Sequence, residues 1–186
     1  MTFLAELWMP IVLSAVLVFV ASSLIHMVFK WHNSDYLKFS NEEGVRTALR
    51  AATSGPGMYV VPHISDMKQL GTAEVQKKFI DGPVGFISLK APGPPTMSAA
   101  LAQWFIFSLV IAALVAYLAH HALPPGSSFL GVCRIVGAIV FLAYGAGSVS
   151  QGIWMGKPWR SVSKELLDAA IYATLNALAF AWLWPH

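Results

Sequence analysis

The segment AALAQWFIFSLVIAALVAYL, residues 99–118, decides the fold class of this chain. It contains no Asp, Glu, Lys or Arg, and a helix of about 20 such residues crosses the ~30 Å hydrocarbon core of a bilayer. A second apolar run, FLGVCRIVGAIVFLAYGAGSV at 129–149, follows the helix-breaking turn Pro124-Pro125-Gly126-Ser127. These two runs are therefore predicted to form an antiparallel pair of transmembrane helices.

Two more apolar runs of about 20 residues are 7–29, which has no charged residue, and 166–184, whose one charged residue is Asp168. The whole chain of 186 residues is 56% hydrophobic and only 11% charged, which is the composition of a protein dissolved in lipid. We expect an all-α membrane protein, a four-transmembrane-helix bundle. Residues 1–30 hold the first helix, 31–98 a folded connection on the cytoplasmic side, and 99–186 the other three helices.

The tryptophans support this placement of the spans. Indole rings prefer the headgroup level of a membrane, so they mark the ends of spans and serve as interface anchors. All seven fall at or near the predicted ends, namely Trp8, Trp31, Trp104, Trp154, Trp159, Trp182 and Trp184.

The distribution of Lys and Arg predicts the orientation. Basic residues collect in the first and third connections, whereas the turn at 120–128 and both termini have none. Since cytoplasmic loops retain Lys and Arg during insertion, both termini are expected outside a bacterial inner membrane. The net charge of +3 comes from basic residues interleaved with acids beside apolar segments, which argues against nucleic acid as a partner. The single cysteine, Cys133, excludes an internal disulfide framework and a cysteine-based zinc site.

The connection at 31–98 is long and patterned enough to fold. Ser40-Asn41-Glu42-Glu43 is typical of a capping box, with Ser40 as the N-cap of a short amphipathic helix over 41–52. The stretches 58–61 and 84–89 are extended candidates that can pair as a small hairpin, and a helix is predicted between them at 73–80.

Histidine and aspartate define a candidate metal site at the cytoplasmic face. His32 and His63 each precede an aspartate by three positions, giving His-x-x-Asp twice, and His26 lies near the end of the first span. Imidazole and carboxylate ligate transition metals, but neither spacing is a specific metal motif, and loop His and Asp commonly bond backbone instead. A haem would need a second axial ligand at the depth of His26, and no other span has a histidine there on the cytoplasmic side. We therefore expect His26 to form a hydrogen bond with a neighbouring helix. The candidate metal ligands are His26, His32, Asp35, His63 and Asp66.

Ionisable residues inside spans are functional candidates because burying them in lipid is costly. Arg134 is expected to extend to the outer headgroups, and Asp168 to sit in the first turn of the last helix. The inner half of the third span, 145–152, is rich in Gly, Ala and Ser, which favours close helix packing within or between chains; a polar passage is the alternative. The candidate ligand-binding residues are Ser148, Gln151, Asp168 and Asn176.

The segment Gly156-Lys157-Pro158-Trp159, followed by a span ending in Ala181-Trp182-Leu183-Trp184-Pro185, resembles small four-helix bacterial membrane proteins of unknown function. The resemblance implies the architecture and no activity.

Three functional classes follow. A structural or interaction subunit, as a homo-oligomer or within a membrane complex, is favoured because packing alone explains its features. A small-molecule transporter or ligand-binding membrane protein is the alternative, and a metal- or haem-binding redox subunit is third. No cofactor is predicted, and enzymatic activity is not indicated because no phosphate loop, His-Glu-x-x-His, Gly-x-Ser-x-Gly or Cys-x-x-Cys motif occurs.

Overall fold

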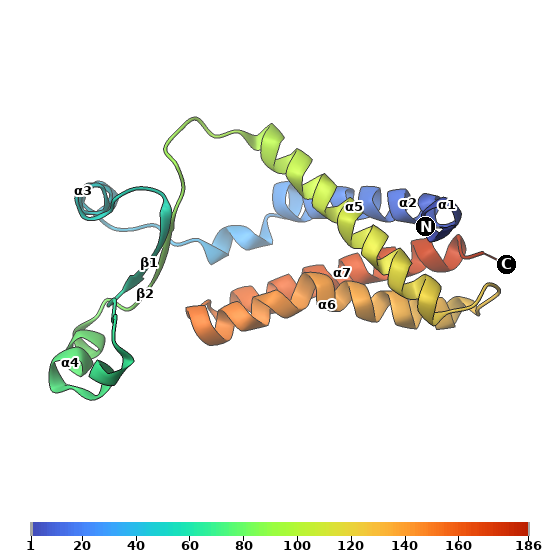
Figure 1. Cartoon of the computed structure of the whole chain (residues 1–186). Helices are drawn as coiled ribbons and strands as arrows, with labels where there is room; N and C mark the ends of the chain where they lie inside the picture. The colour runs from blue at the N-terminus through green and yellow to red at the C-terminus, as the bar shows by residue number, and fades with distance from the viewer. Residues whose placement is uncertain (1, 186) are drawn as a thin grey trace. The chain divides into compact units, whose positions relative to one another are not determined.

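A computed structural model describes residues 2–185, and His186 lies outside the described residues. The chain divides into two compact units, which Figure 1 shows in one view. The helical unit comprises the residues up to Tyr36, Thr96–Gly152 and the residues from Lys157 onward. The connecting unit comprises Leu37–Pro95 and Ile153–Gly156.

The helical unit is built from four long helical segments. A short helix α1 (Thr2–Glu6) precedes α2 (Trp8–Ser23), which continues as the π-helix η1 (Leu24–Phe29). Then come α5 (Met97–Ala122), α6 (Phe129–Met155) and α7 (Trp159–Trp182). Pro10 cannot donate a backbone hydrogen bond, which accounts for the break between α1 and α2.

Three of these segments are long and apolar enough to cross a membrane: Trp8–Phe29, Met97–Ala122 and Phe129–Met155. This confirms three of the predicted spans and makes the chain a multi-pass membrane protein. The fourth, α7, is a helix of 24 residues but is not among these candidates. Its first half holds Arg160, Lys164, Glu165 and Asp168, which lower its hydropathy.

The core of the helical unit consists mainly of small and β-branched side chains, so the helices approach closely. Val18 of α2, Val115 of α5, Val136 of α6 and Phe180 of α7 are all almost completely buried. Large apolar side chains on the opposite faces are exposed, among them Val20, Leu114 and Leu142, as expected of helices whose outer surface meets lipid.

Both ends of the chain lie at the same end of this unit, beside the turn between α5 and α6. Near the N-terminus, the ring of Phe3 packs edge-on against Tyr117, with centroids 5.6 Å apart. Near the C-terminus, the Gly126 amide donates to the Pro185 carbonyl at 2.8 Å, and the Trp184 indole donates to the Pro124 carbonyl at 3.2 Å.

The connecting unit contains a two-stranded antiparallel sheet of β1 (Gly57–Val61) and β2 (Gly85–Leu89), with Tyr59 opposite Ile87. This is the predicted hairpin. Between the strands lie the 3-10 helix η3 (Met67–Gly71) and α4 (Ala73–Asp81), and α3 precedes them at Glu42–Ala52.

The predicted capping box of α3 is wrong by one residue. Asn41, not Ser40, is the N-cap, and its side-chain oxygen accepts from the Gly44 amide at 3.0 Å. The Glu43 carboxylate does not reach back to the cap, because it pairs with Arg46 at 2.7 Å and Arg50 at 3.2 Å along the helix. The Asn41 cap thus satisfies one backbone amide of the first turn, and the arginines satisfy the Glu43 carboxylate.

Candidate functional site

The end of the first span reverses direction and brings two histidines together. In η1 the Lys30 amide bonds to the Ile25 carbonyl at 2.9 Å, the wider i to i−5 spacing of a π-helix, and π-turns are frequent at functional sites. Lys30 then adopts a left-handed conformation with φ 54°, which ends the helix and starts the 3-10 helix η2 (Trp31–Asp35). As a result the His26 and His32 rings stack, with centroids 4.8 Å apart and planes 5° apart.

His32 lies between two carboxylates. Its Nδ1 is 2.8 Å from Asp35 Oδ2 and its Nε2 is 2.8 Å from Asp168 Oδ2 of α7. A neutral imidazole has one N–H and one acceptor nitrogen, so both contacts are hydrogen bonds only if both ring nitrogens, or one of the carboxyls, carry a proton. His32 and Asp168 are both buried, and this contact joins residues 136 positions apart in the chain.

Within the helical unit, Lys164 of α7 holds η2 against α7. Its ammonium donates to the Trp31 carbonyl at 2.7 Å, the Ser34 hydroxyl at 2.8 Å and the Asp35 Oδ1 at 2.6 Å, which uses all three of its N–H groups. The hydrogen bond from Lys164 lowers the pKa of the Asp35 carboxyl from 3.8 to about 2, with a smaller contribution from His32. Asp35 is therefore ionised at neutral pH.

Asp168 lies deeper in its helix than the sequence suggested. Because α7 begins at Trp159 and not near Leu166, Asp168 is about two and a half turns inside the helix and cannot be a first-turn carboxylate stabilised by the helix N-terminus. Within the described residues its Oδ1 is buried and has no hydrogen-bond partner. Such a buried oxygen is costly unless a ligand satisfies it.

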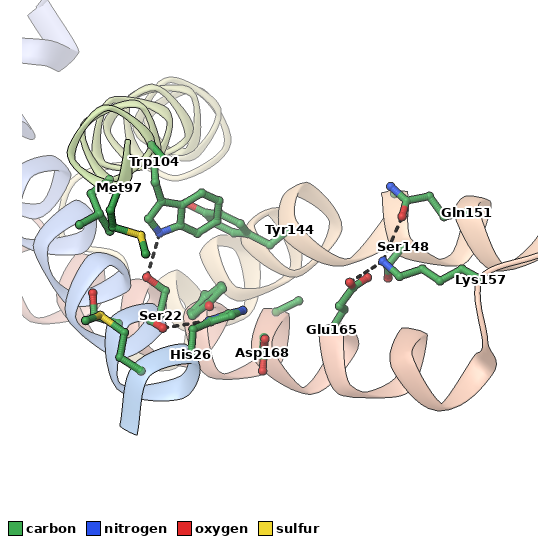
Figure 2. A pocket seen from close by; sticks show the side chains of 17 residues that line it. Ser22, His26, Met97, Trp104, Tyr144, Ser148, Gln151, Lys157, Glu165 and Asp168 are labelled. Atoms are coloured by element: carbon green, nitrogen blue, oxygen red, sulfur yellow. Dashed lines mark hydrogen bonds and ion pairs between the residues drawn. The ribbon is translucent and has the colours of Figure 1, made fainter. Parts of the chain in front are cut away.

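A cavity of about 650 Å³ opens beside these residues, within the helical unit (Figure 2). Residues of α2, η1, α5, α6 and α7 line it. Its apolar wall includes Met27, Met97, Ala100, Leu101, Trp104, Gly147 and Ala169. Its more polar members are Ser22, Ser23, His26, Tyr144, Ser148, Gln151, Lys157, Glu165, Asp168 and Tyr172.

An aromatic cluster forms one wall of the cavity. The Tyr144 and Tyr172 rings meet edge-on with centroids 5.3 Å apart, and Trp104 lies 6.0 Å from Tyr144 and 6.4 Å from Tyr172. The Trp104 indole N–H donates to Ser22 Oγ at 2.8 Å, which connects α5 to α2 and fixes the indole (Figure 2). These rings provide rigid apolar surface with polar edges.

A polar group of side chains also lines the cavity. The Lys157 ammonium pairs with the Glu165 carboxylate and donates to Gln151 Oε1 at 3.0 Å. Ser148 is buried and donates to the Gly145 carbonyl of its own helix at 2.7 Å. The charges here are mutually paired, so the cavity presents hydrogen-bonding groups without a large unbalanced charge.

The predicted ligand-binding residues fall partly on this cavity. Ser148, Gln151 and Asp168 line it. Asn176 is buried elsewhere in α7, where its side-chain amide donates to the Tyr172 carbonyl at 2.8 Å. The sequence missed Trp104, Tyr144 and Tyr172 as cavity residues, because an aromatic residue in a span is equally typical of helix packing.

The predicted metal ligands divide between the two units. His26, His32 and Asp35 belong to the helical unit, together with Asp168. His63 and Asp66 belong to the connecting unit, where Asp66 caps η3 by accepting from the Lys68 amide at 3.0 Å. The expectation that His26 bonds a neighbouring helix is wrong, since its Nδ1 lies 2.9 Å from the Ser22 carbonyl of its own helix.

The small residues of α6 serve mainly to pack that helix on α7. A Cβ atom added to Gly145 would lie 3.1 Å from Ala169 Cβ, and one added to Gly152 would lie 3.1 Å from Val162 Cγ2. Gly147 instead lines the cavity, with no atom within 4 Å of the position of a Cβ. Residues 145–152 of α6 thus pack closely against α7 on one face and line the cavity on another.

Comparison with protein-family models, with curated proteins and with solved structures found no match to this chain.

Proposed function

We propose that this chain is a four-helix membrane protein that binds a small amphipathic molecule in the cavity of its helical unit, as a small transporter or ligand-binding membrane protein. The observation that carries the proposal is the cavity itself. Its volume of about 650 Å³ lies in the range of small-molecule sites, and it combines apolar and aromatic walls with a few polar groups that can orient a ligand.

A fourth crossing by α7 is part of this proposal. Both chain ends lie beside the turn between α5 and α6, and an even number of crossings returns a chain to the side where it began. A helix of 24 residues is about 36 Å long, enough to span the hydrocarbon core. More of α7 is buried by the other helices than of any of them, and its polar residues Asp168 and Asn176 are shielded from lipid.

The orientation of the cavity follows from the basic residues near it. Lys30, Lys157, Arg160 and Lys164 all lie at the cavity end of the helical unit, whereas the turn at 123–128 has no Lys or Arg. We infer that the cavity faces the cytoplasmic side of a bacterial inner membrane and that both termini are outside.

The residues that line the cavity indicate the kind of ligand that it would bind. An apolar or aromatic body would pack against Trp104, Tyr144 and Tyr172, and hydrogen-bonding groups would meet Gln151 or Asp168. The unpartnered Asp168 Oδ1 favours a ligand that donates a hydrogen bond or carries positive charge.

The sequence favoured a structural or self-associating subunit instead. That interpretation depended on packing alone, with the folded connection and the small residues of α6 as contact surfaces. Since Gly145 and Gly152 pack against α7, that part of α6 is used within the chain, which removes one of the arguments for self-association.

The experiment is native mass spectrometry of the protein released from native membranes in mild detergent. Wild type is expected to carry a small bound molecule. Gly147→Trp fills the cavity from its open face and should abolish the bound mass, whereas Ala138→Trp, on an exposed face of the same helix, should retain it. Equal occupancy in the two variants, or none in wild type, argues against the proposal.

A further inference from the structure

We propose that His26, His32 and Asp168 form a binding site for a divalent transition-metal ion at the wall of the cavity. One ligand atom from each residue lies within 4.8 Å of the others, which places two imidazoles and one carboxylate close together. This inference stands apart from the proposal of an organic ligand and can hold if that proposal fails.

The hydrogen bonds of the two Nδ1 atoms identify Nε2 as the nitrogen that each histidine would offer to a metal. His26 Nδ1 faces the Ser22 carbonyl at 2.9 Å, and His32 Nδ1 faces the Asp35 carboxylate at 2.8 Å. Each Nδ1–H can therefore be donated to an oxygen, which directs the Nε2 lone pair of each ring to a metal. Metal-ligating histidines almost always have their second nitrogen held by a carbonyl or carboxylate in this way.

Asp168 supplies the independent sign that a ligand belongs here. Its side chain is more than nine-tenths buried, and within the described part of the chain its Oδ1 has no hydrogen-bond partner. A buried carboxylate with one unsatisfied oxygen is expensive to maintain, and a metal ion would satisfy it.

The local charge also suits a cation. The Asp35 carboxylate pairs with the Lys164 ammonium, so these two charges cancel. A hydrogen bond between His32 Nε2 and Asp168 Oδ2 requires one proton, which is released to solvent when a metal takes its place. Asp168 then supplies one negative charge, and a divalent ion changes the site from neutral to one positive charge.

A bound ion requires a small adjustment of the rings. Metal–ligand distances of about 2.0–2.2 Å place two ligand atoms of a tetrahedral ion roughly 3.3 Å apart, so His32 Nε2 and Asp168 Oδ2, now 2.8 Å apart, must separate slightly. The two rings are parallel, so their lone pairs lie in separate planes and one ring must tilt. His26 is exposed on the cavity wall and its ring makes one hydrogen bond, so its ring is the one that can move.

The donor set selects the class of metal. Two imidazoles and one carboxylate suit Zn²⁺, Co²⁺ or Fe²⁺ and not Mg²⁺ or Ca²⁺, which prefer oxygen ligands. Three protein ligands leave at least one coordination position open, and here it faces the cavity.

The test uses the tag-free full chain in detergent, stripped with a chelator and titrated with Co²⁺, then with Zn²⁺ as competitor. Visible absorption of Co²⁺ reports low-symmetry nitrogen and oxygen ligation. We expect one Co²⁺ per wild-type chain, displaced by Zn²⁺. His26→Gln, which loses one ligand and only one hydrogen bond, should weaken binding at least tenfold, as should Asp168→Asn.

The matched control is His63→Ala, since His63 belongs to the connecting unit. It should bind Co²⁺ with wild-type affinity. The proposal is overturned if wild type shows no absorption band, if His26→Gln binds as tightly as wild type, or if His63→Ala loses the site. Size-exclusion and circular-dichroism profiles establish that the variants are folded. If Asp168→Asn does not fold, His26→Gln still decides the test.

Discussion

Replacing Lys164 by methionine tests how η2 is held against α7. The change keeps the length of the side chain but removes donors to the Trp31 carbonyl, the Ser34 hydroxyl and the Asp35 carboxylate. A bond between charged partners contributes about 1.5–3 kcal/mol and each of the others about 0.5–1.5 kcal/mol. With both side chains of the ion pair at least four-fifths buried, the expected loss is about 3–5 kcal/mol.

The assay is unfolding in mixed micelles with increasing SDS, followed by the change in helical circular dichroism. Lys157→Met is the matched control, because Lys157 also pairs with a carboxylate of α7, that of Glu165, but is more exposed. Its loss should be about 1 kcal/mol. Backbone amides 31–35 should also exchange faster with deuterium in Lys164→Met than in the control. Equal destabilisation by the two substitutions would refute the anchoring role of Lys164.

Three other outcomes are expected. The Asp35 pKa is lowered from 3.8 to about 2 by Lys164 and His32, so the ionised carboxylate stabilises the chelator-treated protein above pH 3.8. This contribution to the unfolding free energy should disappear as the pH falls from 3.8 to 2. Asp35→Asn should lack that loss in an acid titration. Gly145→Val should destabilise by about 1–3 kcal/mol because its side chain meets Ala169 and Leu166, whereas Gly147→Val should cost clearly less in the same SDS assay. Trp104→Phe removes the donor to Ser22 and should cost about 1 kcal/mol in the same assay, and an unchanged stability would show that this bond contributes nothing.

Hydropathy alone predicted the membrane class and three of the spans, because a helix of about 20 apolar residues matches the hydrocarbon core of a bilayer in length and polarity. The start of α7 was missed, since Arg160, Lys164 and Glu165 resemble a loop until their partners are known. Helix formation there follows from Pro158 at the N-cap, whose carbonyl accepts from the Ser161 and Val162 amides at 2.9 and 3.1 Å, and from burial of those two residues.

The site could be predicted only in pieces. His26, His32, Asp35 and Asp168 were each singled out, yet nothing in a single sequence pairs residues 136 positions apart. The pairing depends on the π-turn of η1 and the left-handed Lys30, and neither has a dependable sequence signal for a non-glycine residue.

The contact between His32 Nε2 and Asp168 Oδ2 joins η2 to α7, and it holds Asp168 of the cavity wall and two residues of the proposed metal site. A double-mutant cycle of unfolding free energies with His32→Gln, Asp168→Asn and the pair measures it most directly. The structure predicts a coupling energy of about 1–3 kcal/mol, the range for a hydrogen bond to a charged group in a buried setting. Additive effects of the two substitutions, with no coupling beyond error, would contradict the site as described.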